Sequence, residues 1–171
     1  MIKKLTLQNL SDINKPNQPF KIIGKIIPTF SNGTWSYTEA LFDNEYEKLF
    51  PNDDEQWEDY INNPNKTVFF YYDNTDCVGQ VRLRKNWNGY ALIEDIAVAK
   101  SHRKSGIGAK LIAKAIEWAK VNGLPGLMLE TQDNNLLAFR FYNKLGFKIG
   151  GVDTMLYGNS DEVAVFWYMQ F

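Results

Sequence analysis

The chain has 171 residues, of which 44% are hydrophobic and 23% are charged, and its net charge at pH 7 is −1. This length and composition predict a globular protein with a single domain over residues 1–171, and they exclude a disordered or fibrous chain. The near-neutral charge favours neither nucleic acid nor an anionic membrane as a partner, and no apolar run approaches the roughly 20 residues of a membrane-spanning helix.

The first half of the chain predicts an antiparallel sheet. Its strands are expected at residues 20–28, 35–39, 67–72, 77–85 and 90–98. They are rich in β-branched and aromatic residues, and turn pairs such as Asn32-Gly33 and Asn88-Gly89 separate them. Turns this short join antiparallel neighbours.

The segment at residues 43–63 is acidic and carries spaced aromatic and aliphatic residues. The spacing predicts one or two short amphipathic helices. The run Asp53-Asp54-Glu55 is interpreted as a solvent-exposed face, because charge runs usually are. The alternative is that it forms an acidic entrance for a cationic substrate.

The second half of the chain changes to a helical period. Apolar residues recur on one face from Gly106 to Val121, and Asn122-Gly123 ends this expected helix. A buried strand, a second helix and two final strands are expected at residues 126–131, 135–145, 147–157 and 163–171. The order predicts an α/β fold in which helices flank one mixed, mostly antiparallel sheet.

A short basic loop joins a strand to the helix that begins at Gly106, and it includes Arg103 and Lys104. The first turn of a helix presents unpaired N–H groups and the positive end of its dipole, and glycines let a ligand approach the backbone. We therefore predict a diphosphate site. The alternative is that the glycines only tighten the connection. The pattern is neither a P-loop nor a Rossmann loop, because no Lys-Ser/Thr pair follows Gly106 and Leu111 stands at the third glycine position.

Two separated motifs resemble those of the GNAT superfamily of N-acetyltransferases. The first is R-x-x-G-x-G at residues 103–108, and the second is N-x-x-A-x-x-x-Y-x-x-x-G-F at residues 135–147. Within that superfamily the chain resembles the streptothricin acetyltransferases, which acetylate an amino group on the β-lysine part of the antibiotic. The segments that carry this closer resemblance are residues 25–28, 83–88, 93–98, 129–135, 152–157 and 165–168.

The resemblance implies a GNAT-type fold with six to seven strands and about four helices. It also implies acetyl-CoA as the co-substrate, with no metal. In GNAT folds the backbone of the strand before the basic loop pairs with the pantetheine arm. The residues expected to bind acetyl-CoA on this basis are Ile96, Ala97, Val98, Arg103, Lys104, Ser105, Gly106, Ile107, Gly108, Ala109, Asn135 and Tyr142.

Tyr142 is implied to be the general acid that protonates the departing CoA thiolate. Asn135 is implied to bond the pantetheine or its neighbour. Helix geometry places both residues on one stripe, at about 100° per residue, while Leu137, Phe141 and Leu145 suit the core. The alternative is a tyrosine that only covers the edge of the core.

An alkylamine has a pKa of about 10.4 and is mostly protonated at neutral pH, so a base or a water relay must remove a proton. Glu94 is the preferred base and Asp95 is the second candidate. Either carboxylate could instead bind the cationic acceptor or pair with a nearby Lys or Arg. Asp153 is a weaker candidate for binding the acceptor.

The strand at residues 90–98 is expected to contain a β-bulge. Ala91 and Ile93 share one side-chain parity, and Ile96 and Val98 share the other. One extra residue near Glu94-Asp95 accounts for the change.

Direct transfer within a ternary complex is expected. Cys77 could carry an acetyl-enzyme, but it follows a turn that lies far from the basic loop in the pattern. One cysteine excludes an internal disulfide framework, and the single histidine, His102, makes a histidine-based metal site unexpected. The first residues show no signal-peptide pattern, so a cytoplasmic protein is expected.

Other acceptors stay open, namely protein N-termini, lysine side chains and polyamines, and so does a sensor that binds acyl-CoA without turnover. The expected partner is a small cationic amine rather than nucleic acid or a membrane, and a homodimer is left open. Trp35, Tyr37 and Trp87 are candidates for lining the acceptor pocket, although sheet packing explains them equally well.

Overall fold

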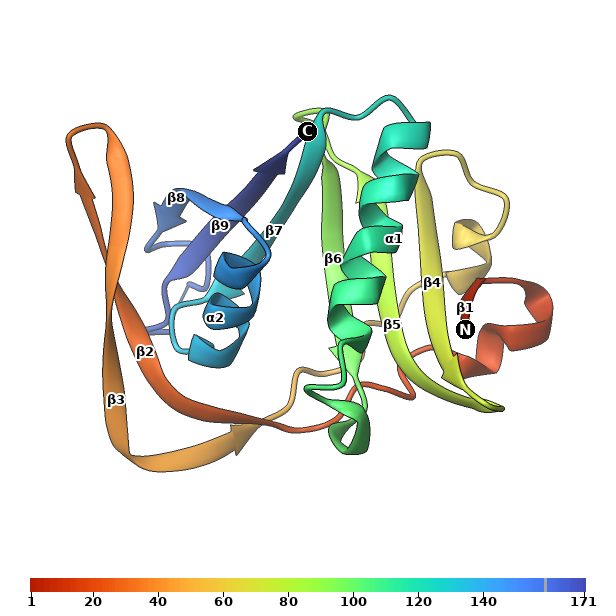
Figure 1. Ribbon diagram of the computed structural model, residues 1–171, viewed down its shortest axis with the longest axis horizontal. Coiled ribbons are helices and arrows are strands. Elements are labelled where there is room, and N and C mark those ends of the chain that lie inside the picture. The colour runs from red at the N-terminus through yellow and green to blue at the C-terminus, as the bar shows by residue number, and fades with distance from the viewer. Residues whose placement is uncertain (159) are drawn as a thin grey trace. The chain divides into compact units, whose positions relative to one another are not determined.

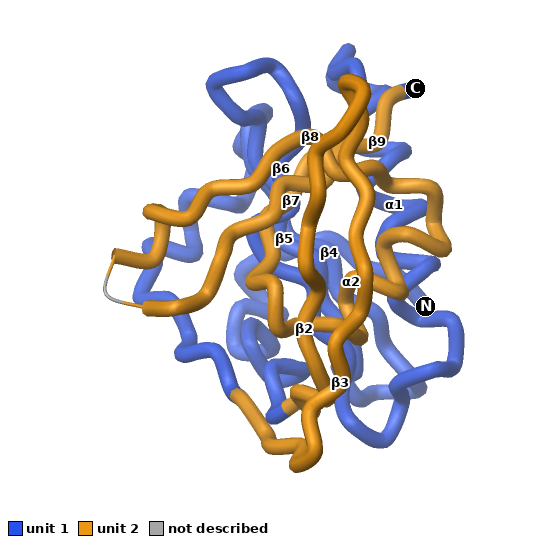
Figure 2. The backbone as a smooth tube through the Cα atoms, turned by 90° about the vertical axis from the view of Figure 1, so that its left-hand side faces the viewer, with its two compact units in different colours: residues 1–19, 49–127, 171 blue, residues 20–48, 128–170 orange. Residues whose placement is uncertain are grey.

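The computed structural model describes residues 1–158 and 160–171, and these form two compact units. Unit 1 comprises residues 1–19, 49–127 and 171, and unit 2 comprises residues 20–48 and 128–170. Figure 2 shows them in blue and orange. Each unit is therefore assembled from segments that lie far apart in the sequence.

The main sheet has seven strands, as expected. In unit 1 the strand order is β1 (Ile2–Lys4), β4 (Lys66–Asp73), β5 (Asp76–Lys85) and β6 (Ala91–Val98). In unit 2 the order is β7 (Gly126–Gln132, all but its first two residues), β9 (Ala164–Gln170) and β8 (Lys148–Asp153). The pairs β1–β4, β4–β5, β5–β6 and β8–β9 are antiparallel. The fold is thus the mixed, mostly antiparallel α/β arrangement that the sequence predicts.

Unit 1 packs one long helix on its strands. Helix α1 (Ile107–Val121) lies across β4, β5 and β6 (Figure 1). Its apolar stripe is buried, and the buried side chains are Ile107, Leu111, Ile112, Ala115 and Ala119. Gly79 of β5 permits this close approach, because a Cβ there would lie 2.9 Å from Cγ2 of Ile107.

A smaller core in unit 1 gathers around the 3-10 helices η1 (Leu7–Asp12) and η2 (Trp57–Tyr60). Its buried members are Leu5, Tyr60, Val68, Phe70 and Tyr72. Tyr60 thereby fixes the end of an otherwise exposed acidic segment. Within residues 1–158 and 160–171, no helix is long and apolar enough to cross a membrane.

Unit 2 contains a second sheet that covers its helix. The strands β2 (Phe20–Ser31) and β3 (Thr34–Lys48) form an antiparallel pair, and β2 packs against α2 (Leu136–Lys144). Behind α2, the ring of Phe139 lies 4.9 Å from that of Trp167. The Trp167 indole donates a 3.1 Å hydrogen bond to Thr131, so this tryptophan joins β9 to β7.

Two expectations about helices are wrong. Residues 43–63 do not form amphipathic helices, because β3 continues to Lys48 and only Trp57–Tyr60 makes a 3-10 turn. The pairing of Phe20 with Lys48 extends the ladder into the first part of this segment, where tertiary pairing overrides a weak helical spacing. The described residues also contain two α-helices and three short 3-10 helices, rather than about four flanking helices.

The contact between β2 and β3 depends on the absence of a side chain at Gly24. A Cβ there would lie 2.4 Å from the carbonyl oxygen of Ala40 and 2.9 Å from Cα of Leu41, and backbone atoms cannot move aside cheaply. We expect Gly24→Ala to lower the free energy of unfolding by about 1–3 kcal/mol, measured by thermal or urea unfolding. Gly151→Ala is the matched control, because a Cβ at Gly151 meets nothing within 4 Å. Equal stability of the two variants would contradict this account.

Candidate functional site

The basic loop between β6 and α1 has the geometry of an anion site. After the 3-10 helix η3 (Lys100–His102), Lys104 and Gly106 both adopt left-handed backbone angles, with φ of 63° and 85°. No side chain among the described residues caps the start of α1, so its first N–H groups keep their capacity for an acceptor. A Cβ at Gly106 would meet nothing within 4 Å, so the turn is open above its backbone. These features fit a diphosphate next to exposed Lys104.

The side chain of Arg103 binds backbone carbonyl oxygens of the protein. Its guanidinium donates to the carbonyl oxygens of Val98 at 3.0 Å, Pro19 at 2.8 Å and Gln18 at 2.9 Å. The Gln18 side chain in turn accepts a 2.7 Å bond from the backbone N–H of Lys100. Arg103 and Gln18 therefore clamp the basic loop to residues 18–19. The charge of Arg103, expected from the sequence to face the anion, is thus directed at the protein backbone, and no motif gives a signal for the role of Gln18.

Other loop residues also have defined places. Ile107 is buried at the start of α1, and Ser105 donates to the carbonyl oxygen of His102. The ring of His102 lies 2.8 Å from the Ser101 hydroxyl and 3.2 Å from Asp73, so it connects the loop to the end of β4. These contacts stabilise the loop on the side of β4.

The expected β-bulge in β6 is confirmed. Arg82 of β5 pairs with Asp95, and the next residue, Leu83, pairs with Ile93, so Glu94 is the extra residue. Beyond the bulge, Ile96, Ala97 and Val98 continue the ladder to β5. In a regular strand, neighbouring side chains point to opposite faces of the sheet. The bulge interrupts this alternation at Glu94 and Asp95.

Glu94 is held by cationic and phenolic donors. Nε of Arg84 lies 2.8 Å from Oε1, and the Tyr60 hydroxyl donates to Oε2 at 2.9 Å. Nε of buried Arg82 lies 3.6 Å from the same Oε2. Burial and the adjacent Glu94 charge raise the pKa of Tyr60, so this phenol stays protonated and donates. These three side chains, which come from β5 and η2, therefore hold both oxygens of the Glu94 carboxylate in place.

Asp95 has a different environment. Nε2 of Gln80 donates to its Oδ2, and Gln80 is itself fixed by Asn14, whose N–H donates to Oε1 at 2.8 Å. Burial raises the pKa of Asp95, while the Gln80 hydrogen bond and the charge of Arg82 oppose the shift. A carboxylate with a raised pKa accepts protons more readily near neutral pH.

Arg82 also binds the acidic segment. Its guanidinium forms an ion pair with Asp53 and lies 5.3 Å from the centre of the Trp57 ring. Asp53 is therefore part of a structural ion pair, while Asp54 and Glu55 are exposed. Arg82 and Tyr60 are functional-site residues that are not among the candidates predicted from the sequence. No motif gave a signal for Arg82, because β5 also carries Asp76, Gln80, Arg84 and Lys85.

In unit 2, Tyr142 lies in an aromatic cluster. Its ring centre is 5.2 Å from Phe141, 5.5 Å from Phe147 and 6.2 Å from Trp167, and the residue is 5% exposed. The expected orientation of this helix is wrong, because Leu136, Phe139 and Tyr142 are its buried residues. β2 packs against the same helix, so the position of neighbouring elements, and not helix spacing alone, selects the buried face.

Two further candidates of unit 2 occupy ends of elements. The side-chain oxygen of Asn135 caps α2 by accepting from the N–H of Ala138 at 3.3 Å. Asp153 ends β8, and its Oδ1 accepts from the N–H of Met155 at 2.7 Å. Both side chains thus organise a local turn as well as carrying the polar groups that the sequence analysis identified.

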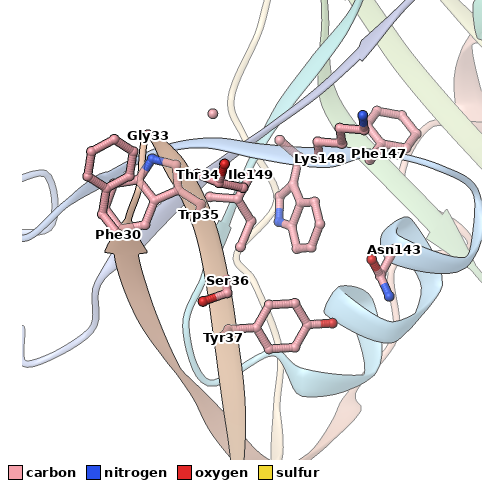
Figure 3. Close-up of a pocket in the computed structure, with 12 residues that line it drawn as sticks. Phe30, Gly33, Thr34, Trp35, Ser36, Tyr37, Asn143, Phe147, Lys148 and Ile149 are labelled. Atoms are coloured by element: carbon pink, nitrogen blue, oxygen red, sulfur yellow. The ribbon is translucent and has the colours of Figure 1, made fainter.

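Aromatic residues of β2 and β3 line a pocket of about 610 Å³ in unit 2. Figure 3 shows Phe30 and Trp35 on one side of it, with the hydroxyl of Tyr37 directed toward Asn143 of α2. Trp35 and Tyr37 therefore lie at one pocket, whereas Trp87 is 92% exposed and belongs to unit 1.

Cys77 is poorly suited to covalent catalysis. Burial raises the pKa of its thiol to about 11, so little thiolate exists at neutral pH. Among residues 1–158 and 160–171, no group of three or more His, Cys, Asp or Glu side chains is arranged to hold a metal ion.

Comparison with known proteins gives consistent matches. The model of the Acetyltransferase (GNAT) family matches residues 33–147. The chain is 53% identical to streptothricin acetyltransferase A of Bacillus subtilis (strain 168) over 174 residues, with 100% of both chains covered. It is 36% identical to streptothricin acetyltransferase of Escherichia coli over 127 residues, which are 72% of this chain and 70% of the relative. A crystal structure from Bacillus anthracis str. Ames, assigned as a streptothricin acetyltransferase in complex with acetyl coenzyme A, matches with a TM-score of 0.93 at 38% identity, covering 100% of this chain and 99% of the other.

Proposed function

The chain belongs to the acetyltransferase (GNAT) family, and from this premise we propose that it transfers the acetyl group of acetyl-CoA to a primary amine of streptothricin, on the β-lysine part of the antibiotic. The observation that carries this proposal is the 53% identity over the full length of streptothricin acetyltransferase A. The same full-length match supports a single catalytic domain over residues 1–171. We further propose that the enzyme works in the cytoplasm and inactivates the antibiotic there; the homodimer stays a prediction.

The basic loop fits acetyl-CoA as the co-substrate. Backbone N–H groups can bind a pyrophosphate at this loop, because Lys104 and Gly106 adopt left-handed angles and no side chain of the described residues caps the start of α1. We assign this role to the backbone of residues 103–109, with the side chain of Lys104 adding positive charge. Ile96, Ala97 and Val98 are proposed to pair through their backbone with the pantetheine arm, and Asn135 to bond it from the start of α2. When bound, acetyl-CoA supplies the thioester carbonyl that the acceptor amine attacks.

We assign the general base to Asp95 and an anchoring role to Glu94. Both oxygens of Glu94 are already engaged by side chains of the protein, namely Arg84, Tyr60 and Arg82. Asp95 has a raised pKa from burial and faces a neutral donor, Gln80. This reverses the preference from sequence alone, and it is supported by charge environment and hydrogen bonding.

We assign the general acid to Tyr142, and Asp153 to binding the acceptor. The aromatic cluster around Tyr142 supports the first assignment, because three packed rings fix the direction of its side chain. Proton donation to the departing thiolate requires such a fixed phenol. No acetyl-enzyme is needed, which agrees with the raised pKa of Cys77.

The two basic side chains of the loop are expected to respond differently to salt. Arg103→Gln removes hydrogen bonds to three carbonyl oxygens, and we expect the KM for acetyl-CoA to rise about tenfold or more at any ionic strength. Lys104→Gln removes an exposed charge, so its smaller effect should fade in about 0.5 M salt. Steady-state kinetics at low and high salt measure both. An Arg103 effect that disappears in salt would contradict the clamp.

The function is tested by the release of free thiol from acetyl-CoA, with streptothricin, spermidine and a lysine-bearing peptide as acceptors at equal concentration. We expect turnover on streptothricin, with kcat/KM at least 100-fold above the other amines. Preferred turnover on another amine would contradict streptothricin as the acceptor, while N-acetyl transfer from acetyl-CoA would stand. Binding of acetyl-CoA without turnover on any of the three would favour the sensor.

A further inference from the structure

Gln80 of β5 lies next to the proposed general base. It is 2% exposed, whereas glutamine is an exposed residue in most proteins. Gln80 pairs with Ala97 of β6, and Arg82 pairs with Asp95. Side chains two residues apart on a strand share a face, so Gln80, Arg82 and Asp95 lie on one face of the sheet. Because Gly79 meets α1, this face is the one that points away from that helix.

The amide of Gln80 is paired with Asn14 through two hydrogen bonds. Its Oε1 accepts from the backbone N–H of Asn14 at 2.8 Å, and its Nε2 donates to Oδ1 of Asn14 at 3.1 Å. Asn14 has a left-handed backbone with φ of 64°, which asparagine adopts more readily than most residues. The reverse orientation of the amide would set two N–H groups against each other. Asn14 therefore determines which end of the Gln80 amide carries the donors.

This pairing leaves one N–H of Gln80 for Asp95. The group donates to Oδ2 of Asp95, and among the described residues no donor bonds the other oxygen, Oδ1. The charged groups around this carboxylate are Arg82 of β5, Asp53 of the acidic segment and the adjacent Glu94. Only Arg82 is positive, and its hydrogen bond goes to Asp53. Within the described part of the chain, Gln80 is therefore the hydrogen-bond donor that orients the Asp95 carboxylate.

We infer that Gln80 is a positioning residue for acetyl transfer, which holds Oδ2 of Asp95 and leaves Oδ1 to accept the amine proton. This inference rests on the proposed function, because it takes Asp95 as the general base. A base must stay within about 2.6–3.2 Å of the group that gives up the proton. A carboxylate that is held at one oxygen cannot rotate out of that geometry. Asn14 is the second part of the arrangement, because it fixes the Gln80 amide.

Gln80→Met tests the inference, because it removes the hydrogen bond and keeps an unbranched side chain. The bond favours the charged form of Asp95, so its loss should raise the pKa of that carboxyl group. We expect the acidic limb of kcat/KM for streptothricin to move to higher pH by about one pH unit, which is the usual size of such a bond. The plateau value of kcat should fall about tenfold, because the carboxylate can rotate. The KM for acetyl-CoA should stay unchanged.

Tyr72→Phe is the matched control for Gln80→Met. The Tyr72 hydroxyl donates to Asp12 of η1, just before Asn14, so this variant loosens the same segment and leaves the bonds of Gln80 in place. Asp12 is not among the charges that shift the pKa of Asp95. The acidic limb of Tyr72→Phe should therefore coincide with that of the wild type. A fall in kcat of Gln80→Met with the limb in place is what a loss of fold would give, and it would overturn the inference.

Asn14→Gly is a second variant, and it decides the question if Gln80→Met does not fold. Glycine accepts the left-handed backbone and keeps the N–H that bonds Oε1 of Gln80, but it lacks the oxygen that holds Nε2. We expect the acidic limb to move in the same direction as in Gln80→Met, by a smaller amount. A limb at the wild-type position would overturn the role of Asn14.

A second measurement does not depend on turnover. NMR titration of the side-chain carboxyl carbon gives the pKa of Asp95 directly, with Asp95→Asn identifying its resonance. The pKa should be higher in Gln80→Met than in the wild type, and equal values would overturn the inference. A pKa difference without movement of the limb would show that Asp95 is not the base, and it would overturn the positioning role. Absence of streptothricin turnover in the wild type would overturn the proposed function, and the titration would then judge the Gln80 bond separately.

Discussion

Tyr142→Phe is expected to lower kcat by about 10²- to 10⁴-fold, which is the usual contribution of a positioned general acid. Phenylalanine keeps the ring contacts with Phe141, Phe147 and Trp167, so the loss should come from the hydroxyl alone. The KM for acetyl-CoA should change little. Steady-state kinetics with streptothricin measure the effect, and thermal unfolding verifies that the fold is retained.

Tyr71→Phe is the control for this substitution. Tyr71 lies on β4 in unit 1, where its hydroxyl contacts Lys110 at 3.3 Å, and it should retain wild-type kcat. If Tyr142→Phe keeps kcat within about threefold of the wild type, the tyrosine only covers the core and another group protonates the thiolate.

Asp95→Asn is expected to lower kcat/KM by about 10²- to 10⁴-fold at neutral pH. Asparagine can still pair with Gln80 but cannot accept the amine proton. Because burial raises the pKa of Asp95, the wild-type kcat/KM should fall on the acid side at a pH above the ordinary aspartate value of 3.8. The substitution should remove that acidic limb. The pH profile of kcat/KM is therefore the decisive measurement.

Glu94→Gln separates the two neighbouring carboxylates. It removes one charged partner from buried Arg82, which keeps Asp53, and one from Arg84, so we expect lower thermal stability as its main effect. Its pH profile should keep the acidic limb of the wild type. If the acidic limb of the kcat/KM profile disappears in Glu94→Gln and persists in Asp95→Asn, then Glu94 is the general base and Asp95 has the anchoring role.

The basic loop and the strands show what local sequence predicts well. The left-handed turn at Gly106 and the start of α1 lie where the R-x-x-G-x-G pattern predicts them, because few residues besides glycine accept that backbone angle. The bulge at Glu94 was also predictable, since a change in side-chain parity is a local property of a strand.

The helix α2 and the segment at residues 43–63 show where local patterns fail. Leu137 is 39% exposed although its spacing suits a core face, because β2 and the sheet of unit 2 select which side of α2 is covered. The 43–63 segment has helical spacing, yet pairing with β2 continues β3 to Lys48. In both cases, partners distant in sequence determined the outcome.

The sequence by itself determined the order of the strands and of the two α-helices, the turn of the basic loop and the two family motifs, because these depend on neighbours within a few residues. Only the tertiary structure decided how the carboxylates differ. Glu94 meets Tyr60 and two arginines from other segments, and Asp95 meets Gln80. The proton affinity of a carboxylate depends on burial and on nearby charges and donors, which the folded chain brings together from distant positions.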